Sequence, residues 1–477
     1  MTSQRPIKII AALAVLLAGA LYGCWWLTPE FISNTNTLEH PVFAFCSALF
    51  IASTAWFGIV LCLRRSAFSG RVILMASLLF GLGLRLMFFD STPVYENDFQ
   101  RYLWDGAVTA SGENPYRFSP HEVFEAGKPG ATSVPDLTRL ALKSNSADYL
   151  AAKVNSKKLT TIYPPAAQAV FAVAYWIAPY KAWGLKLVFL FFEILGGIAL
   201  LAGLRARGLP LIWSAAYWLN PIIIFTTYNG VHMDVLLVAP ILGALLCVGK
   251  YPFRAAILLS LAGSLKIWPL LLAPVLFRGW RQRPVIYIGV AVVVGALTAL
   301  SLAPMFLQLN PEPLNTQSGL SAYSATWTNS SFIFPGIRDA IGLIFDNSNR
   351  LARYAIAIIL TGLSLWLGFL KPQDKSTLPA HLLILSAAFV LLSPTGYPWY
   401  FIWFLMFLPF VVNHWSARGL ALLTIGATVY FARFYIGESG HYSFYQKVLL
   451  PIEFGIPLLV LAWDGLISKR LKANRHG

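Results

Sequence analysis

Fourteen apolar runs dominate this 477-residue chain and constrain its fold more than any other feature. Each run holds about 16 to 26 residues, close to the roughly 20 that a helix needs to cross a bilayer core. Only 12% of the residues are charged, against roughly 25% in a soluble domain. These features predict an all-α polytopic membrane protein and exclude a soluble enzyme or a disordered chain. The runs lie near residues 8–27, 41–63, 71–89, 164–179, 186–203, 209–227, 232–249, 252–277, 284–304, 351–370, 378–393, 398–414, 418–434 and 447–466.

Basic residues outnumber acidic ones, 36 to 20, and they cluster in short loops between the apolar runs. This is the distribution that the positive-inside rule produces, so no nucleic-acid partner is expected. Arg5 and Lys8 place the N-terminus on the cytoplasmic side, and the basic residues within 468–472 place the C-terminus there too. The number of full spans is therefore even, and the expected location is the plasma (inner) membrane.

Two of the apolar runs are unsuited to a full crossing. Run 164–179 is short and follows a Pro-Pro pair, and run 252–277 is interrupted by Lys266 and Pro269. If both are half-spans, only Lys181 and Lys186 stay on the outside against the positive-inside rule. We therefore predict about twelve full spans plus two half-spans, whose irregular backbone lines a cavity. Fourteen full spans would instead strand four basic residues outside: Arg205, Arg207, Lys250 and Arg254.

Two long polar stretches, 90–163 and 305–350, interrupt the apolar runs. Because both termini are inside and the span count is even, both stretches are predicted to be extracytoplasmic loops that contain interfacial helices. No internal repeat or flexible linker divides the chain, so residues 1–477 are predicted to form a single membrane domain.

The first loop begins with two acids, Glu96 and Asp98, directly after a membrane exit. Helical spacing of apolar residues follows, and Arg101 lies four residues before Asp105, the spacing of an ion pair on a helix. In one interpretation Asp98 caps this helix, whose aromatic residues anchor it at the membrane surface. In the other, the acids deprotonate a hydroxyl or hold a divalent cation, Mg²⁺ or Mn²⁺, where a lipid headgroup would lie.

Three other polar positions could carry chemistry. His232 and Asp234 lie two residues apart in a turn between apolar runs, where a hydrogen-bonded loop histidine is the common alternative. Lys266 is the only charge between residues 255 and 277 of its apolar run. It either snorkels to an interface or faces a polar cavity, where an ammonium suits an anionic phosphate. Residues 393–400 break two apolar runs with three aromatics that suit an interfacial belt or a pocket rim.

These segments together resemble the GT-C superfamily of polytopic glycosyltransferases, most closely the bacterial branch that transfers mannose from polyprenol-phosphate-mannose. The resemblance extends over residues 95–400, and its first motif is the most specific. The matching segments are Glu96-Asn97-Asp98-Phe99-Gln100-Arg101-Tyr102-Leu103-Trp104-Asp105-Gly106, Asn114-Pro115-Tyr116, Tyr163-Pro164-Pro165, Asn220-Pro221, Asn229-Gly230-Val231-His232-Met233-Asp234, Leu265-Lys266-Ile267-Trp268-Pro269, Ser393-Pro394 and Pro398-Trp399-Tyr400.

The resemblance implies transfer of a hexose, expected to be mannose, from a polyprenyl-phosphate donor to a hydroxyl of a lipid-linked or cell-envelope glycan. A general base would come from Asp98 or Glu96; the family's acids are adjacent or nearly so, and Asn97 separates them here. We favour Asp98. The implied donor phosphate and lipid site comprises Lys266, Arg101, Tyr397 and Trp399, and the implied acceptor or sugar pocket comprises Tyr163, His232, Asp234 and Trp104.

The chemistry needs only one carboxylate, because a lipid phosphate is already a good leaving group and one base suffices for an inverting displacement. A multi-pass transporter or lipid flippase is the alternative function, although such proteins commonly show internal repeats and this chain shows none. A polymer ligase would depend on basic residues in loop 305–350, which has only Arg338 and Arg350.

Overall fold

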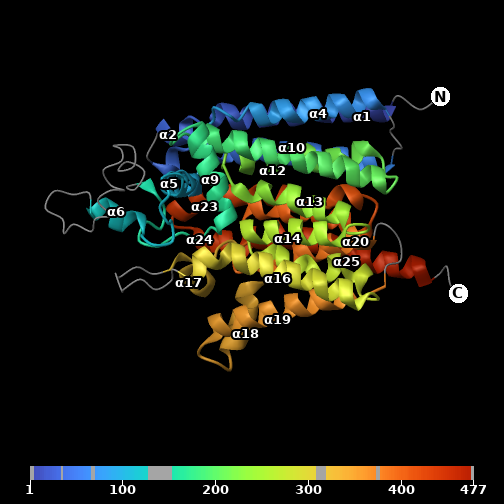
Figure 1. The fold of residues 1–477 in the computed structure, drawn as a ribbon. Helices are drawn as coiled ribbons and strands as arrows, with labels where there is room; N and C mark the ends of the chain where they lie inside the picture. Colours follow the sequence, from blue (N-terminus) through green and yellow to red (C-terminus); the bar gives the residue numbers. More distant parts are fainter. Residues whose placement is uncertain are drawn as a thin grey trace.

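A computed structural model describes residues 5–33, 36–65, 70–126, 153–307, 318–371 and 377–473 of the protein. Helices run side by side along most of the molecule's length (Figure 1). These described ranges contain no β-strand, and their one pairing of extended backbone is a bridge between Asn329 and Thr395. The predicted all-α class is therefore confirmed for the described part of the chain.

Seven described helices are long and apolar enough to cross a membrane. The number rises to eight if Pro221–Tyr228 and Met233–Cys247, which bend by 111° at their junction, count as one span. The prediction of twelve full spans and two half-spans is thus not confirmed, although a helical membrane protein is. The seven are Ile7–Ile32, Val42–Arg64, Ala182–Ala206, Pro284–Phe306, Ser348–Phe369, Trp415–Glu438 and Tyr442–Ser468.

Several other apolar runs are divided into short helices at proline or polar residues. Run 209–227 contains η2 (Leu211–Ser214), α11 (Ala215–Trp218) and α12 (Pro221–Tyr228), with a break at Asn220. Run 398–414 contains η6 (Pro398–Phe401), α21 (Ile402–Leu405) and η7 (Leu408–Phe410). Proline lacks the amide hydrogen and clashes with the preceding helical turn, so it starts a new helix instead of continuing one.

Run 252–277 enters the bundle and returns to the end from which it entered. It forms α14 (Pro252–Leu265), becomes extended at Lys266, and continues as η4 (Trp268–Leu272), α15 (Ala273–Leu276) and η5 (Arg278–Trp280). The indole of Trp280 donates to the carbonyl of Val248 at 2.7 Å, so the segment ends beside its own beginning. The turn at Lys266 thereby reaches the interior from one end of the bundle.

The helix predicted after Glu96 exists as α5 (Asp98–Ala110), and protein covers most of its surface. Residues from Arg101 to Val108 are buried, and Tyr102 stacks on Phe171 of α9 (Pro165–Ile177) at 4.6 Å between ring centroids. A Cβ atom on Gly106 would lie 2.5 Å from the carbonyl oxygen of Phe171. Helix α9 therefore packs closely on α5, so the aromatic residues of α5 contact protein.

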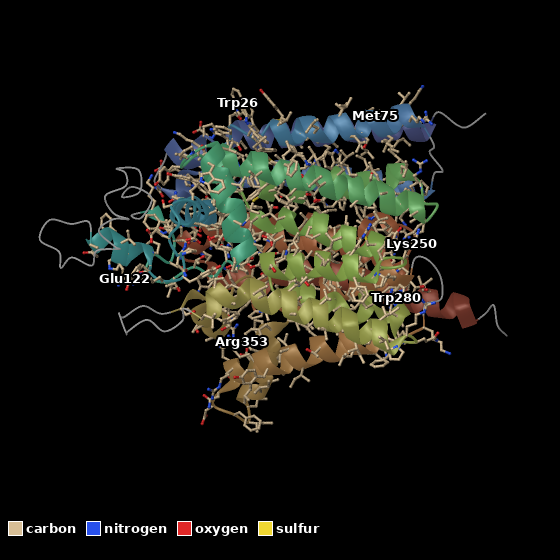
Figure 2. The ribbon with its side chains drawn as sticks, viewed as in Figure 1. Trp26, Met75, Glu122, Lys250, Trp280 and Arg353 are labelled. Carbon is tan, nitrogen blue, oxygen red and sulfur yellow. The ribbon has the colours of Figure 1, made fainter. Side chains whose placement is uncertain are left out.

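The two ends of the bundle carry different segments. Helix α1 (Arg5–Leu27) begins, and α25 (Leu450–Ala473) ends, at the right of Figure 1. At the opposite end lie α5, α6 (Pro120–Ala126) and α17 (Gly319–Thr326), which belong to the two long polar stretches. Figure 2 shows Lys250 and Trp280 at the first end and Glu122 at the second. The described parts of both polar stretches therefore share one end of the bundle.

A fully buried ion pair joins α4 (Arg71–Leu86) to α10 (Ala182–Ala206). Arg85 donates to both oxygens of Glu193, at 2.6 and 2.7 Å, and the hydroxyls of Tyr217 and Tyr228 donate to the same carboxylate. Ionisable groups inside a membrane bundle are stable only when they are paired in this way. The network fixes α4 against the centre of the bundle. Helix α4 leads into the loop that carries Glu96 and Asp98, here called the acidic loop.

Candidate functional site

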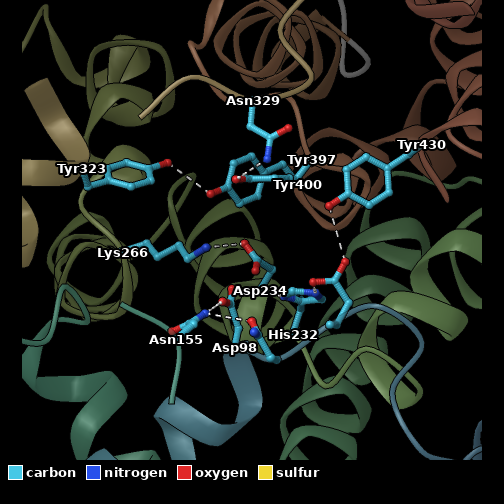
Figure 3. Close-up of polar contacts among 12 residues, drawn as sticks. Asp98, Asn155, His232, Asp234, Lys266, Tyr323, Asn329, Tyr397, Tyr400 and Tyr430 are labelled. Atoms are coloured by element: carbon cyan, nitrogen blue, oxygen red, sulfur yellow. Dashed lines mark hydrogen bonds and ion pairs between the residues drawn. The ribbon is translucent and has the colours of Figure 1, made fainter. Parts of the chain in front are cut away.

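The acidic loop borders a cavity of about 670 Å³ at the end of the bundle that carries α5 and α17 (Figure 3). Its wall contains the acids Glu96, Asp98 and Asp234. The wall also contains four cations, and its other residues are largely aromatic. The cations are Arg101, Lys266, Arg353 and Arg433, and the aromatic residues are Tyr95, Tyr102, Tyr163, Trp268, Tyr323, Trp327, Phe389, Tyr397, Trp399, Tyr400, Trp403, Tyr430 and Phe434.

The chain that leads into Glu96 is held by two buried residues. Lys186 of α10 donates to the carbonyls of Phe88 and Ser91, at 2.7 and 2.8 Å, and so satisfies backbone oxygens after the end of α4. The side-chain amide of Asn229 accepts from the backbone of Val94 at 3.0 Å and donates to the carbonyl of Thr92 at 2.8 Å. Lys186, which the charge rule could not place, is therefore a backbone anchor.

Asp98 is a side chain of the cavity and does not cap its own helix. It lies in the first turn of α5, where Asn97 occupies the cap position. Asn155 donates to one carboxylate oxygen at 2.5 Å, and Nδ1 of His232 lies 3.9 Å from the other. The side chain is 29% exposed. Burial raises the pKa of Asp98 above its ordinary value, and the nearby His232 and the Asn155 hydrogen bond oppose that rise.

Glu96 is the more enclosed of the two acids, with a side chain that is 10% exposed. One oxygen lies 3.4 Å from Nε2 of His232, and the other accepts from the hydroxyl of Tyr430 at 3.5 Å. Burial raises the pKa of Glu96 to about 8, although Arg433 and the Tyr430 hydroxyl act in the opposite direction. The two acids of one motif therefore occupy different electrostatic environments.

His232 lies behind the cavity wall. Its imidazole stacks on the indole of Trp399 with 3.6 Å between ring centroids, and Trp399 stacks on Tyr397 at 4.3 Å. The two aromatic residues border the cavity as predicted, whereas the 1% exposed His232 does not. The prediction that His232 lines a sugar or acceptor pocket is corrected: its two nitrogens face the two acids.

Lys266 is not a lone ammonium. Its Nζ lies 2.7 Å from one oxygen of Asp234, and the indole of Trp403 donates to the same oxygen at 2.7 Å. The ammonium also lies 4.8 Å above the ring of Tyr400. Lys266 borders the cavity with its side chain 18% exposed, so it does not snorkel to an interface. The second oxygen of Asp234 is buried without a hydrogen bond from any described residue.

Arg101 and Asp105 form the predicted ion pair at 2.9 Å. Arg101 also donates to the carbonyl of Leu159 at 3.1 Å, and Asp105 accepts from Thr161 at 2.5 Å. The pair therefore fastens the end of the first long loop to α5, and Arg101 reaches the cavity with its charge already compensated. The i, i+4 spacing alone did not indicate that the pair attaches this loop to α5.

Of the two aromatic residues assigned to the acceptor or sugar pocket, one borders the cavity. Tyr163 lies in the wall, and its carbonyl accepts from the hydroxyl of Tyr116 at 2.8 Å. Trp104 is only 5% exposed and is absent from the wall. It belongs to the hydrophobic core, because α5 is buried on several faces and not on one alone.

The sequence did not indicate several residues of the site, and three of them carry a charge or fix one. Asn155 fixes Asp98, as described above, and Arg433 of α23 (Val429–Glu438) and Arg353 of α19 (Ser348–Phe369) border the cavity. Arg433 donates to the Tyr430 hydroxyl at 2.7 Å and to the side chain of Asn329. Arg433 lies one residue from the end of the apolar run 418–434, which also begins with Arg418, so its sequence signal was weaker than that of Lys266.

Neither of these two arginines forms an ion pair with a carboxylate of the described chain. Arg353 donates instead to the carbonyl of Trp327 at 2.8 Å. The cavity thus has two cations whose charge an incoming anion could balance. Among the same described residues, no group of three or more His, Cys, Asp or Glu side chains is arranged to hold a metal ion.

A comparison of the chain with protein-family models, curated proteins and solved structures finds no match. The function is therefore inferred from the chemistry of the cavity.

Proposed function

We propose that the protein is an integral-membrane glycosyltransferase that moves a hexose, expected to be mannose, from a polyprenyl-phosphate donor to a hydroxyl of a glycan or glycolipid. One observation carries the proposal: a single cavity holds a partly exposed carboxylate, Asp98, and two arginines without carboxylate partners in the described chain, Arg353 and Arg433. Transfer from a lipid phosphate needs both a base and a site for an anionic leaving group.

The reaction is a single displacement at the anomeric carbon. Asp98 accepts the proton of the acceptor hydroxyl while that oxygen attacks, and the bond between the anomeric carbon and the phosphate oxygen breaks. The electron pair of that bond leaves with the polyprenyl phosphate, and the configuration inverts. Asn155, which donates to Asp98 at 2.5 Å, fixes the carboxylate for this step. General-base catalysis of this kind contributes about 10² to 10⁴ in rate.

The arginines are the better candidates for the phosphate. Negative charge grows on the phosphate as the bond breaks, and a cation near it stabilises the transition state. The charge of Lys266 is already balanced by Asp234 at 2.7 Å, so its attraction for a further anion is weakened. Arg433 and Arg353 have no such partner in the described residues, and guanidinium groups bind phosphate oxygens through paired hydrogen bonds.

The aromatic wall suits the rest of the donor. Tyr397, Trp399, Tyr400 and Trp403 present flat apolar faces with a few polar groups, including Lys266 and Asp234. Such faces pack against the apolar side of a sugar ring or against the first isoprene units, and the polar groups can take hydroxyls. Tyr163 contributes to the same wall.

The orientation of the cavity is also part of the proposal. Both long polar stretches have described residues at the end opposite the start of α1, and Lys250 lies at the end where the basic loops gather (Figure 2). The positive-inside rule then makes the cavity extracytoplasmic and both termini cytoplasmic, in the plasma membrane. The returning segment around Lys266 would be one of the two half-spans, and α9 the other.

The test is transfer by purified protein in detergent or nanodiscs. Polyprenyl-phosphate-linked mannose, glucose and galactose are offered with a panel of glycolipid acceptors, and product is detected by mass spectrometry. Turnover of one donor that is lost in Asp98→Asn supports the proposal. Flipping of fluorescent lipid or uptake of substrate by proteoliposomes, without any transfer, would favour the transporter or flippase alternative and overturn it.

A further inference from the structure

One imidazole lies between the two acids of the motif. His232 places Nε2 at 3.4 Å from an oxygen of Glu96 and Nδ1 at 3.9 Å from an oxygen of Asp98. The ring is held between them by its stack on Trp399, with an interplanar angle of 9°. Neither ring nitrogen forms a hydrogen bond with a described residue, so both carboxylates are electrostatic neighbours of the ring at 3.4 and 3.9 Å. The three groups thus form a row, Glu96–His232–Asp98, and Figure 3 labels His232 and Asp98.

Proton counting restricts the states that this row can adopt. A neutral imidazole has one N–H, so it can donate to one carboxylate only. If both acids were ionised, the other nitrogen would direct its lone pair at a carboxylate oxygen. A doubly protonated imidazolium would satisfy both acids, but burial of a 1% exposed ring disfavours that charge. A proton on one of the two acids removes this repulsion between the lone pair and the carboxylate oxygen.

We infer that the protonated acid is Glu96 and that it acts through His232 as a positioning residue, while Asp98 is the catalytic base. A proton on Glu96 faces the lone pair of Nε2, 3.4 Å away, which leaves the ring proton on Nδ1, 3.9 Å from Asp98. Asn155 donates to the other oxygen of Asp98 at 2.5 Å. Both oxygens of an ionised Asp98 thereby face donors, and this inference rests on the proposed transferase function.

The surroundings of each acid favour this assignment. Glu96 is 10% exposed, whereas Asp98 is 29% exposed and more accessible to an acceptor hydroxyl. The pKa of Glu96 is raised to about 8 by burial, so it is protonated at neutral pH. Other groups that face the row are Tyr430 and Arg433 on the Glu96 side, and Asp234 and Lys266 on the His232 side. Arg433 and Tyr430 favour ionisation of Glu96, but burial outweighs them.

The assignment predicts a pH profile with two limbs. On the acid side, the rate falls as Asp98 becomes protonated, below a pKa that is raised above the ordinary carboxyl value. On the alkaline side, the rate falls above a pKa of about 8, where Glu96 ionises. The ionised Glu96 then draws the ring proton to Nε2, and Nδ1 presents a lone pair to Asp98. The alkaline limb therefore belongs to Glu96 and not to the base.

Glu96→Gln separates the roles, because its amide N–H can face Nε2 as the protonated acid does. We expect this variant to stay within about tenfold of the wild-type kcat at neutral pH and to lose the alkaline limb, whereas removing the base costs about 10² to 10⁴. His232→Phe keeps the stack on Trp399 and removes Nδ1–H, so it should lower kcat with little change in KM. Glu438→Gln, at an exposed position outside the cavity wall, is the matched control.

The inference is overturned if Glu96→Gln is as inactive as Asp98→Asn, or if the alkaline limb persists in Glu96→Gln. Absence of any transfer by the wild type would instead count against the proposed function. The protonation of Glu96 is then still measurable by infrared difference spectroscopy across its pKa. The carbonyl band of a protonated carboxylic acid should vanish on raising the pH, remain in Asp98→Asn and be missing in Glu96→Gln; a band missing from the wild type would overturn the inference.

Discussion

At the residue scale, the pairing of charges decides what each side chain can do. The sequence marks Lys266 as isolated, yet it meets Asp234, 32 positions earlier, at 2.7 Å. The local pattern could not predict this pair, because the two residues are brought together by the break at 229–232 and by the turn after α14. Asp98 was predictable from its place after a membrane exit, whereas its partner Asn155 lies 57 positions away with no local signal.

Replacing Lys266 tests the pair. Lys266→Met leaves the 3% exposed Asp234 without its cation, so the variant should be less stable. Breaking a fully buried pair costs about 3–5 kcal/mol, and the 18% exposure of Lys266 should reduce that cost. The double variant Lys266→Met/Asp234→Asn should recover most of the loss in thermal unfolding measured in detergent. If the single variant is as stable as the wild type, the two groups are not coupled as described.

At the scale of elements, the apolar pattern predicts where helices exist and proline predicts where several of them break. The break before Pro221 follows from the proline itself, and the break at Lys266 comes three residues before Pro269. The burial of α5 was not predictable from its one-sided pattern, because the helix is enclosed by α9 as well as by the core. The contact between α5 and α9 positions the site, and Gly106 permits that contact.

Gly106→Ala tests that contact. The added methyl would lie 2.5 Å from the Phe171 carbonyl oxygen, which is backbone and cannot rotate away. We expect α5 and α9 to separate, with a loss of about 1–3 kcal/mol in stability, as for an overpacked core, and a lower transfer rate because Asp98 moves with α5. Gly83→Ala is the control, since its added methyl has nothing within 4 Å. Equal stability of the two variants would contradict the close packing.

At the scale of the whole molecule, an extracytoplasmic active site requires the cavity and the basic loops to lie on opposite sides of a membrane. Among the described residues, Ser318 caps α17 at the cavity end, and Lys250 lies at the other end (Figures 1 and 2). Ser146, in the first long loop, lies outside the described residues. The two ends could be predicted from charge, but the number of helices long enough to cross could not, because short and broken helices complete the bundle.

Cysteine labelling tests this orientation. With the four native cysteines replaced, Ser318→Cys should react with an impermeant maleimide added to intact cells, and Lys250→Cys should react only after permeabilisation. The opposite result for both positions would place the cavity in the cytoplasm and would remove the extracytoplasmic part of the proposal. Reaction of both sites in intact cells would contradict the arrangement of the bundle itself.

The transfer rate of Asp98→Asn is the most direct test of the central claim, that this cavity is the active site of a glycosyltransferase and Asp98 its base. The amide keeps the shape of the side chain and cannot accept the acceptor's proton. We predict that the rate with a polyprenyl-phosphate sugar falls by about 10² to 10⁴, while expression and donor binding stay close to wild type. A variant that retains a tenth or more of the wild-type rate would contradict the account.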